Sequence, residues 1–225
     1  SWKVLGGVDN PPIEKDADEA KVEELPDGSI LISSRTDRNG RNFNIFRFTN
    51  ARRAEGRWGK MAHSGIENGG VHSERNACNG ELMSVPVTRT SDGKRMHLLL
   101  QSLPLGPGRR NVGIYFKALD NDDDDIWSSP EKLAADWDGP FRVTELGSAY
   151  STMVLQPDSS IGFLYEESTH FKSWIAYTIV YKKLSVEEIP ELKTKSGFGG
   201  YAFGDGATAR NYRHCARCCR IRPQR

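Results

Sequence analysis

"VEELPDGSILI" (residues 22–32) decides the expected fold, because its layout returns twice along the chain. "MVLQPDSSIGF" (153–163) resembles it, and "VPVTRTSDGKRMHLL" (85–99) has the same order of strand, aspartate turn and strand. The turn aspartates, which are 65 and 66 residues apart, are Asp27, Asp92 and Asp158. Self-similarity at a fixed period is typical of repeat architectures, so the sequence predicts three copies of one unit.

Short β-rich runs separated by Gly, Asp, Asn and Pro predict a mostly β chain. The expected strands lie at residues 29–35, 42–49, 81–87, 95–102, 111–119, 152–156, 160–167 and 174–184. In the first two units a tryptophan, Trp58 or Trp127, follows the third strand, and residues 119–141 are expected to form a long inter-strand loop. Each unit is therefore predicted to be a four-stranded sheet.

A small antiparallel sheet cannot bury both of its faces alone, so repeated sheets stack radially as the blades of a propeller. We therefore predict an all-β fold of about three four-stranded antiparallel blades. Three blades cannot close a ring, which indicates part of a larger propeller. A β-sandwich with a chance resemblance between its turns is the alternative.

Composition limits the partners. The 31 Lys and Arg residues nearly balance the 30 Asp and Glu residues, so no basic field points to nucleic acid or to a membrane surface. No apolar run approaches the roughly 20 residues that span a bilayer. The composition therefore favours a small or neutral partner over nucleic acid or a membrane surface.

The last residues differ from the rest of the chain. Residues 1–198 are predicted to form the propeller portion, and residues 199–225 a tail that is disordered or non-native. The tail holds residues with the spacing of metal ligands, namely His214, Cys215, Cys218 and Cys219. One partial half-site in an Arg-rich terminus is weak evidence, so we expect no metal and no cofactor.

The repeat gives two polar residues the same position in different blades. Tyr150 and Glu19 each lie eight residues before the turn aspartate of their own unit. If the innermost strands line a central channel, both side chains lie at one mouth of it, where a carboxylate and a phenol could act as base and nucleophile. The structural alternative is a tyrosine at a strand start and a glutamate in a solvated acidic run, "EKDADEAKVEE" (14–24).

Two arginines favour the functional interpretation. Arg35 ends the second strand of the first unit, and Arg109 lies in the loop that enters the third strand of the middle unit. A guanidinium group presents a rigid fork that suits a carboxylate, so two of them at one channel mouth would bind an anionic ligand.

Four segments in order resemble the exo-sialidases, the six-bladed propeller glycosidases of the bacterial and trypanosomal type. The resemblance covers roughly residues 15–185. Its segments are "DEAKVEELPDGSILISSR" (18–35), "ACNGELMSVP" (77–86), "LLLQSLPLGPGRRNVGIY" (98–115) and "GSAYSTMVLQPDSSIGFLYE" (147–166). The resemblance implies part of a six-bladed propeller that hydrolyses terminal sialic acid with retention through a tyrosyl-enzyme intermediate.

The same resemblance implies residue roles. Tyr150 would be the nucleophile, Glu19 its base, and Arg35 and Arg109 the ligands of the substrate carboxylate. Arg110 competes for the last role, but the arginine of the family stands two residues before the Asn, as Arg109 does here. The implied partners are sialylated glycans, and the implied location is secreted, periplasmic or cell-surface. The small residues that flank Tyr150 are expected to leave room for a sugar.

Some family features are missing from the chain. The Asp boxes of the family, of the form Ser-x-Asp-x-Gly-x-Thr-Trp, are degenerate here, and neither the first arginine nor the acid aspartate has a counterpart. Asp9, Asp16 and Asp18 match no motif, so the isolated chain is expected to cleave a fluorogenic sialoside little or not at all. A non-catalytic sialic-acid-binding propeller and an interaction scaffold are the alternatives. In a lectin-like module, the first arginine or the acid aspartate should be missing from the upstream half. In a scaffold, replacing Arg35 and Arg109 should leave sialic acid binding unchanged, because there is none to lose.

Overall fold

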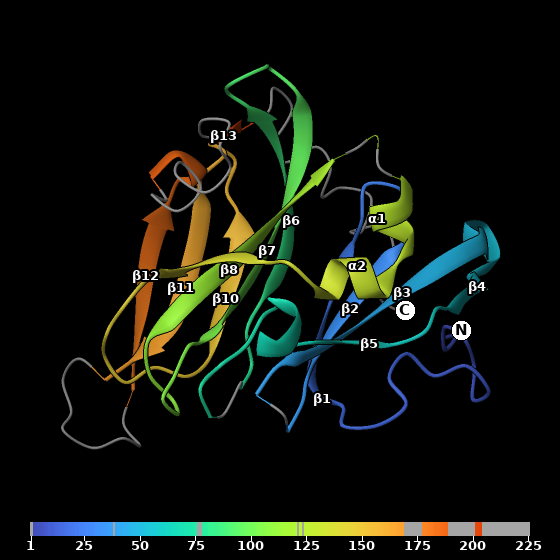
Figure 1. Ribbon diagram of the computed structural model, residues 1–225, viewed down its shortest axis with the longest axis horizontal. Helices are drawn as coiled ribbons and strands as arrows, with labels where there is room; N and C mark the ends of the chain where they lie inside the picture. Colours follow the sequence, from blue (N-terminus) through green and yellow to red (C-terminus); the bar gives the residue numbers. More distant parts are fainter. Residues whose placement is uncertain are drawn as a thin grey trace, which may run out of the picture.

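The computed structural model describes residues 2–37, 39–75, 78–120, 122, 124–168, 177–188 and 201–203 as three antiparallel β-sheets (Figure 1). The first sheet has the order β1-β2-β3-β4, with β5 also paired to β3: Asp18–Glu24, Ile30–Arg35, Arg41–Asn50, Glu55–Trp58 and Ala62–Ser64. The second has the order β13-β6-β7-β8-β9: Tyr201–Phe203, Leu82–Arg89, Arg95–Pro104, Val112–Asp120 and Asp138–Arg142. The third has the order β10-β11-β12: Ser151–Leu155, Ile161–Glu167 and Thr178–Leu184. The predicted all-β blades are confirmed, although the first two sheets have five strands and the third has three among the described residues.

The three predicted turns join the first two strands of each sheet and share one geometry. A carboxylate oxygen of Asp27 accepts from the backbone N–H of Ser29 (2.9 Å), and Asp92 and Asp158 accept in the same way from the residue two positions later. The residue after each aspartate has a left-handed backbone, with φ of +82° at Gly28, +71° at Gly93 and +66° at Ser159. Aspartate followed by a residue that tolerates positive φ is the chemistry of a tight turn, which explains why this pattern marks the repeat.

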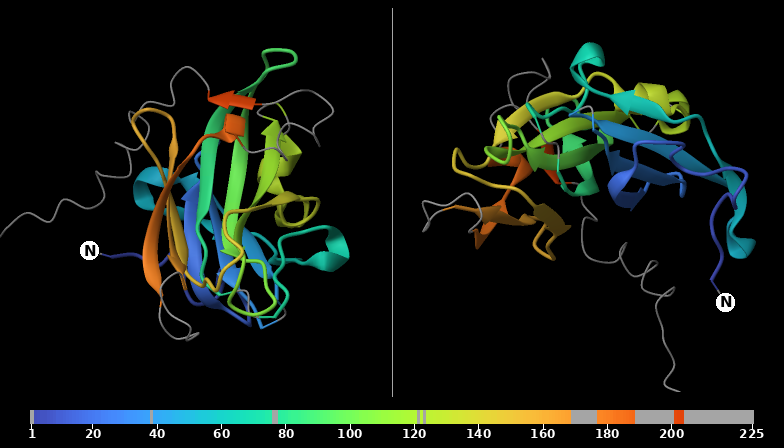
Figure 2. Two further views of the ribbon diagram at one scale, coloured as in Figure 1. Left: turned by 90° about the vertical axis from the view of Figure 1, so that its left-hand side faces the viewer. Right: turned by 90° about the horizontal axis from the view of Figure 1, so that it is seen from below.

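The sheets lie side by side in chain order, and apolar clusters fill the space between them (Figures 1 and 2). Leu98, Leu100 and Phe116 of the second sheet pack with Met153 and Phe163 of the third. Leu31 and Phe43 of the first sheet belong to a second cluster with Leu99 and Leu103, because β7 points alternate side chains to opposite faces. The second sheet thus buries one face against each neighbour, whereas the third leaves Val154, Leu164 and Ile179 exposed on its other face. The inner strands β1, β6 and β10 come together.

The segment 119–141 is not the simple loop that the sequence suggested. It contains two short helices, α1 (Asp124–Ser128) and α2 (Pro130–Ala134), before β9. Ser129 caps α2 by accepting from the backbone N–H of Lys132, and α2 packs on β3 and β5 (Figure 1). A tryptophan follows the third strand in both units, as the sequence indicated, but the surroundings differ: Trp58 ends β4, whereas Trp127 lies in α1.

Three short 3-10 turns complete the described elements: η1 (Ala51–Arg53), η2 (Ile66–Asn68) and η3 (Val186–Glu188). Within the predicted tail, β13 pairs with β6, in the register Tyr201↔Arg89 to Phe203↔Val87. The predicted boundary at residue 198 stays a prediction, and the Cys and His residues of the tail lie outside the described residues. In the described part of the chain no helix is long and apolar enough to cross a membrane.

Glu23 of β1 connects the first two blades through β6. Its carboxylate accepts from the backbone N–H of Ser84 at 2.8 Å. Burial raises the pKa of Glu23 to about 7 from an ordinary 4.5, despite this hydrogen bond, and the negative charges of Glu81 and Glu24 add to the rise. The folded protein therefore holds this proton more tightly than the unfolded chain, so stability falls as the pH rises from about 4.5 to 7.

Glu23→Gln is expected to stabilise the protein at pH 8 by up to about 3 kcal/mol, and by less than about 1 kcal/mol at pH 5. The amide removes the buried charge and keeps an oxygen for the Ser84 N–H. Urea unfolding at the two pH values measures the difference. Glu24→Gln, at the exposed neighbouring position, is the matched control and should change little. An equal gain for Glu23→Gln at both pH values would contradict this explanation.

Candidate functional site

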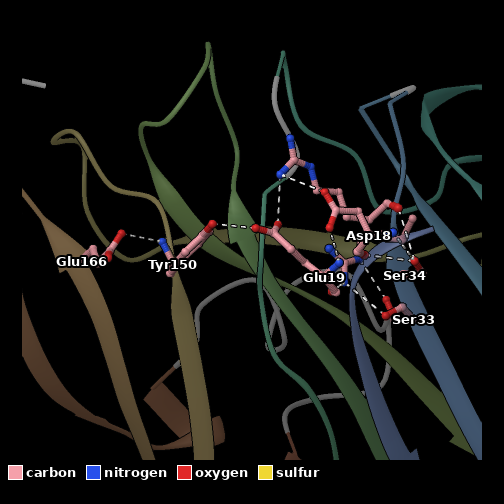
Figure 3. A network of polar contacts seen from close by, with 8 residues as sticks. Asp18, Glu19, Ser33, Ser34, Tyr150 and Glu166 are labelled. Atoms are coloured by element: carbon pink, nitrogen blue, oxygen red, sulfur yellow. Dashed lines mark hydrogen bonds and ion pairs between the residues drawn. The ribbon is translucent and has the colours of Figure 1, made fainter. Parts of the chain in front are cut away.

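Tyr150 and Glu19, which are 131 residues apart in the chain, meet at the ends of the inner strands of the third and first blades (Figure 3). The phenol Oη donates to Glu19 Oε1 at 2.6 Å. Tyr150 is 38% exposed, so the phenol is accessible from solvent. Its backbone N–H donates to a carboxylate oxygen of Glu166 at 3.1 Å, which holds the residue at the start of β10 (Figure 3). The structure thus brings together the two residues that the repeat placed in equivalent positions.

A buried arginine supports the backbone of Glu19. Glu19 has a left-handed φ of +40°, and the β1–β2 register shifts between Asp18 and Lys21. Arg41 of β3 is fully buried, and its Nη2 approaches the Glu19 carbonyl oxygen at 3.4 Å while its Nε donates to Ser33 Oγ at 3.0 Å. Desolvation lowers the pKa of Arg41 to about 10, and Nη1 has no hydrogen-bond partner among the described residues. Non-glycine residues in a left-handed conformation cluster at active sites and ligand clamps, where the surrounding structure holds them in place, as Arg41 does here.

Arg35 lies on the other side of Glu19, where the chain leaves β2. Its Nη1 donates to Glu19 Oε2 at 3.1 Å and lies 3.7 Å from Asp18 Oδ2. Each oxygen of the Glu19 carboxylate therefore has its own donor, the phenol on Oε1 and the guanidinium on Oε2. The arrangement fixes the carboxylate plane between an arginine and a tyrosine.

Arg109 lies over the ring of Tyr150, with its guanidinium carbon 5.7 Å from the ring centroid. The loop that carries it is tied to the segment before Tyr150, because the Ser148 N–H donates to the Arg109 carbonyl at 3.0 Å and Arg110 forms a β-bridge with Gly147. Both arginine side chains are exposed, but Arg109 is the one that contacts the tyrosine. Of the two candidate arginines, Arg109 is thus the one that the structure places beside the tyrosine.

The charges of the site act on the tyrosine and the glutamate in opposite directions. Burial opposes ionisation of Glu19, but the hydrogen bond from Tyr150 and the ion pair with Arg35 outweigh it and hold its pKa below 4.5. The hydrogen bond to Glu19, with partial burial, raises the pKa of Tyr150 above 10, and Arg109 opposes that rise. The resting state is therefore a neutral phenol bonded to a carboxylate.

The small residues on either side of Tyr150 are packed against the protein interior. Ala149 and Ser151 are both buried. The Ser151 hydroxyl lies 2.8 Å from the Ser102 hydroxyl of β7. A cavity of about 170 Å³ lies beside Tyr150 and is lined in part by Ser151, Thr152 and Glu166. That the small residues leave room for a sugar stays a prediction.

Sequence reasoning missed the polar residues of β7 that join the three blades. Gln101 and Ser102 are fully buried within the apolar second half of β7. Gln101 Oε1 accepts from Ser33 Oγ of the first blade at 2.7 Å, while Ser102 contacts Ser151 of the third. Two polar residues inside the apolar run "LLLQSLP" (98–104) were the available signal.

Cys78 is a further reactive side chain near the site. It is fully buried, and burial raises the pKa of its thiol to about 11, so it is neutral. Within the described ranges, no three His, Cys, Asp or Glu side chains gather as a metal ion would require.

The sequence matches no protein-family model, and no curated protein matches it significantly. Solved sialidase structures do share its fold. NanB in complex with optactamide superposes with a TM-score of 0.54 and 23% identity over 77% of this chain and 24% of that one. The intramolecular trans-sialidase from Ruminococcus gnavus, in complex with oseltamivir carboxylate, gives a TM-score of 0.52 and 22% identity over 76% of this chain and 33% of that one.

A third structure, the NanB sialidase from Streptococcus pneumoniae with an ethanesulfonate ligand, gives a TM-score of 0.53 and 21% identity over 76% of this chain and 24% of that one. The chain spans about a quarter to a third of the length of these solved chains. Identities this low establish a shared architecture and leave the chemistry to the site. The chain has the fold of part of a sialidase β-propeller.

Proposed function

We propose that the chain supplies the nucleophile side of an exo-α-sialidase site, which releases terminal sialic acid from glycoconjugates with retention. The observation that carries the proposal is the 2.6 Å hydrogen bond from the Tyr150 phenol to the Glu19 carboxylate, with Arg35 and Arg109 on either side of the pair. In this proposal Tyr150 is the nucleophile, Glu19 its base, and the two arginines hold the substrate carboxylate. A secreted, periplasmic or cell-surface location belongs to the same proposal, because sialylated glycans are carried by glycoproteins and glycolipids.

The residue types suit this substrate. Sialic acid has its carboxylate on the anomeric carbon, so a carboxylate nucleophile would meet a like charge. A neutral phenol avoids that repulsion. Its oxygen bonds to the anomeric carbon as the bond to the departing oxygen breaks, and its proton passes to Glu19. Water then attacks the anomeric carbon and the aryl glycosidic bond to the Tyr150 oxygen breaks, while Glu19 returns the proton to that oxygen. The water proton passes to the conjugate base of the acid that protonated the departing oxygen, and the second inversion restores the original configuration.

The opposed pKa shifts determine when the proton moves. Glu19 is a weak base and Tyr150 a weak acid in the resting site, so transfer before attack is uphill. Transfer becomes favourable as the phenol oxygen donates electrons to the anomeric carbon and its O–H bond weakens. The pair therefore supports proton transfer that accompanies attack and not a preformed phenolate.

The arginines are suited to a carboxylate ligand at this place. Arg109 lies over the phenol ring of Tyr150. Arg35 forms an ion pair with Glu19, the carboxylate that accepts the phenol hydrogen bond. A substrate carboxylate between the two arginines would form charge-assisted hydrogen bonds beside the nucleophilic oxygen. The acid that protonates the departing oxygen is not assigned among the described residues, so further blades would have to supply it.

The binding test uses the 225-residue chain. N-acetylneuraminic acid is expected to bind measurably by NMR titration, while its methyl ester, which lacks the charge, is expected to bind at least about tenfold more weakly. Arg35→Met and Arg109→Met should each raise the Kd by about tenfold or more, since each removes a hydrogen bond to a charged group. Arg110→Met is the matched control and should leave the Kd unchanged.

The outcomes separate the proposed function from its alternatives. An unchanged Kd in both Arg35→Met and Arg109→Met would exclude this carboxylate site and leave the scaffold interpretation. Binding that follows the prediction, together with no sialoside hydrolysis by a propeller completed with the remaining blades, would indicate the lectin-like module.

A further inference from the structure

We propose that Glu81 is a positioning residue that sets the spacing between Tyr150 and Glu19. It does so by contacting the residue two positions after each of them, Thr152 and Lys21. The positioning role follows from contacts within the protein, and it rests on the proposed function only in taking Tyr150 and Glu19 as the reacting pair. The Glu81 carboxylate oxygen Oε2 accepts from Thr152 Oγ1 at 2.6 Å and lies 3.5 Å from Lys21 Nζ. Thr152 lies two residues after Tyr150, and Lys21 two residues after Glu19.

The spacing of two residues matters because side chains alternate along a strand. Residues i and i+2 of a regular strand project to the same side, as the exposed Tyr150 and Thr152 do around the buried Ser151. Along β1 the register shift between Asp18 and Lys21 interrupts this alternation, so the placement there rests on burial. Along β1, Glu19 and Lys21 are both half-buried, whereas the intervening Ala20 is exposed. The contacts of Tyr150 with Glu19 and of Thr152 and Lys21 with Glu81 therefore form two successive rungs between the same pair of strands.

The second rung is needed because β1 and β10 are not hydrogen-bonded to each other. They are edge strands of different sheets, with the second blade between them. A single O–H···O hydrogen bond at an exposed position is easily broken by water. The Glu81 carboxylate, as a second and fixed acceptor, would keep both strands in place when the hydrogen bond between the phenol and Glu19 breaks.

Glu81 is well anchored for this task. The Ser102 N–H donates to its carbonyl at 2.9 Å, its own N–H donates to Ser102 Oγ at 2.8 Å, and Gln101 Nε2 donates to the same carbonyl at 3.1 Å. Both partners are fully buried in β7, the central strand of the second blade. The rung therefore connects the first and third blades to the buried central strand of the middle one.

Thr152→Val and Thr152→Ser test the proposal in the 225-residue chain, because Thr152 is exposed and its methyl group can be kept or its hydroxyl retained. The chain is labelled with ¹³C at the tyrosine Cζ and glutamate Cδ positions, and the Tyr150 and Glu19 signals are titrated by NMR. In Thr152→Val the titration midpoint of Tyr150 should fall toward 10 and that of Glu19 should rise toward 4.5, because their hydrogen bond is populated less. Thr152→Ser should restore both midpoints to the wild-type values.

Lys183→Met is the matched control, because it breaks the ion pair of Lys183 with Asp158 at the other end of the same blade. It should leave both midpoints unchanged. Wild-type midpoints in Thr152→Val, or equal shifts in Lys183→Met, would overturn the positioning role. No sialic acid is present in this experiment, so its failure is distinct from a failure of the binding test, in which the proposed function itself is at stake.

Discussion

Tyr150→Phe is expected to lower kcat for a fluorogenic sialoside at least about a thousandfold in a propeller completed with the remaining blades. The substitution deletes one oxygen atom, which is the proposed nucleophile, and leaves the ring under Arg109. KM should change much less than kcat, because the ring and the arginines that bind the substrate remain. Steady-state kinetics of the two proteins measure both constants.

Tyr181→Phe is the control for this prediction. Tyr181 lies in β12 of the same blade, and its side chain is more than half exposed on the outer part of the sheet. Its variant should keep wild-type kcat. If Tyr150→Phe kept more than about a tenth of the wild-type kcat, the phenol oxygen would not be the nucleophile.

The repeat made the site predictable where residue types alone did not. Glu19 stands in an acidic run that could be solvated surface, and Tyr150 could be an ordinary strand start. Their equal distance from Asp27 and Asp158 predicted that they occupy the same end of two inner strands, and the 2.6 Å contact bears that geometry out. Turn chemistry has a strong sequence signal because few residues adopt positive φ cheaply.

The features that the sequence did not predict depend on tertiary contacts. Arg41 reads as one more charged residue at a strand start, yet it is fully buried beneath Glu19. The helices within residues 119–141 are only five residues each, too short for a clear helical period, and α2 is stabilised by packing on β3 and by the Ser129 cap. The position of Trp127 after the third strand was visible in the sequence, whereas its place in a helix was not.

The chemistry of Glu19 is the step on which the proposed mechanism depends after the nucleophile itself. Its pKa lies below 4.5, so the carboxylate stays ionised down to acidic pH and can accept the phenol proton over the whole neutral range. The pKa of Tyr150 lies above 10 mainly because of the hydrogen bond to Glu19, so the phenol stays protonated until strongly alkaline pH. Both groups are thus in the required protonation state at neutral pH.

Glu19→Gln in the completed propeller is expected to lower kcat by about 100-fold to 1000-fold, because an amide can accept the phenol hydrogen bond but cannot take the proton. The acidic limb of the kcat/KM profile that lies below pH 4.5 in the wild type should disappear, since its titrating group is gone. Asp18→Asn, at the neighbouring carboxylate 3.7 Å from Arg35, is the control and should keep that limb. A Glu19→Gln variant with an unchanged acidic limb would assign the base to another residue, even if kcat had fallen.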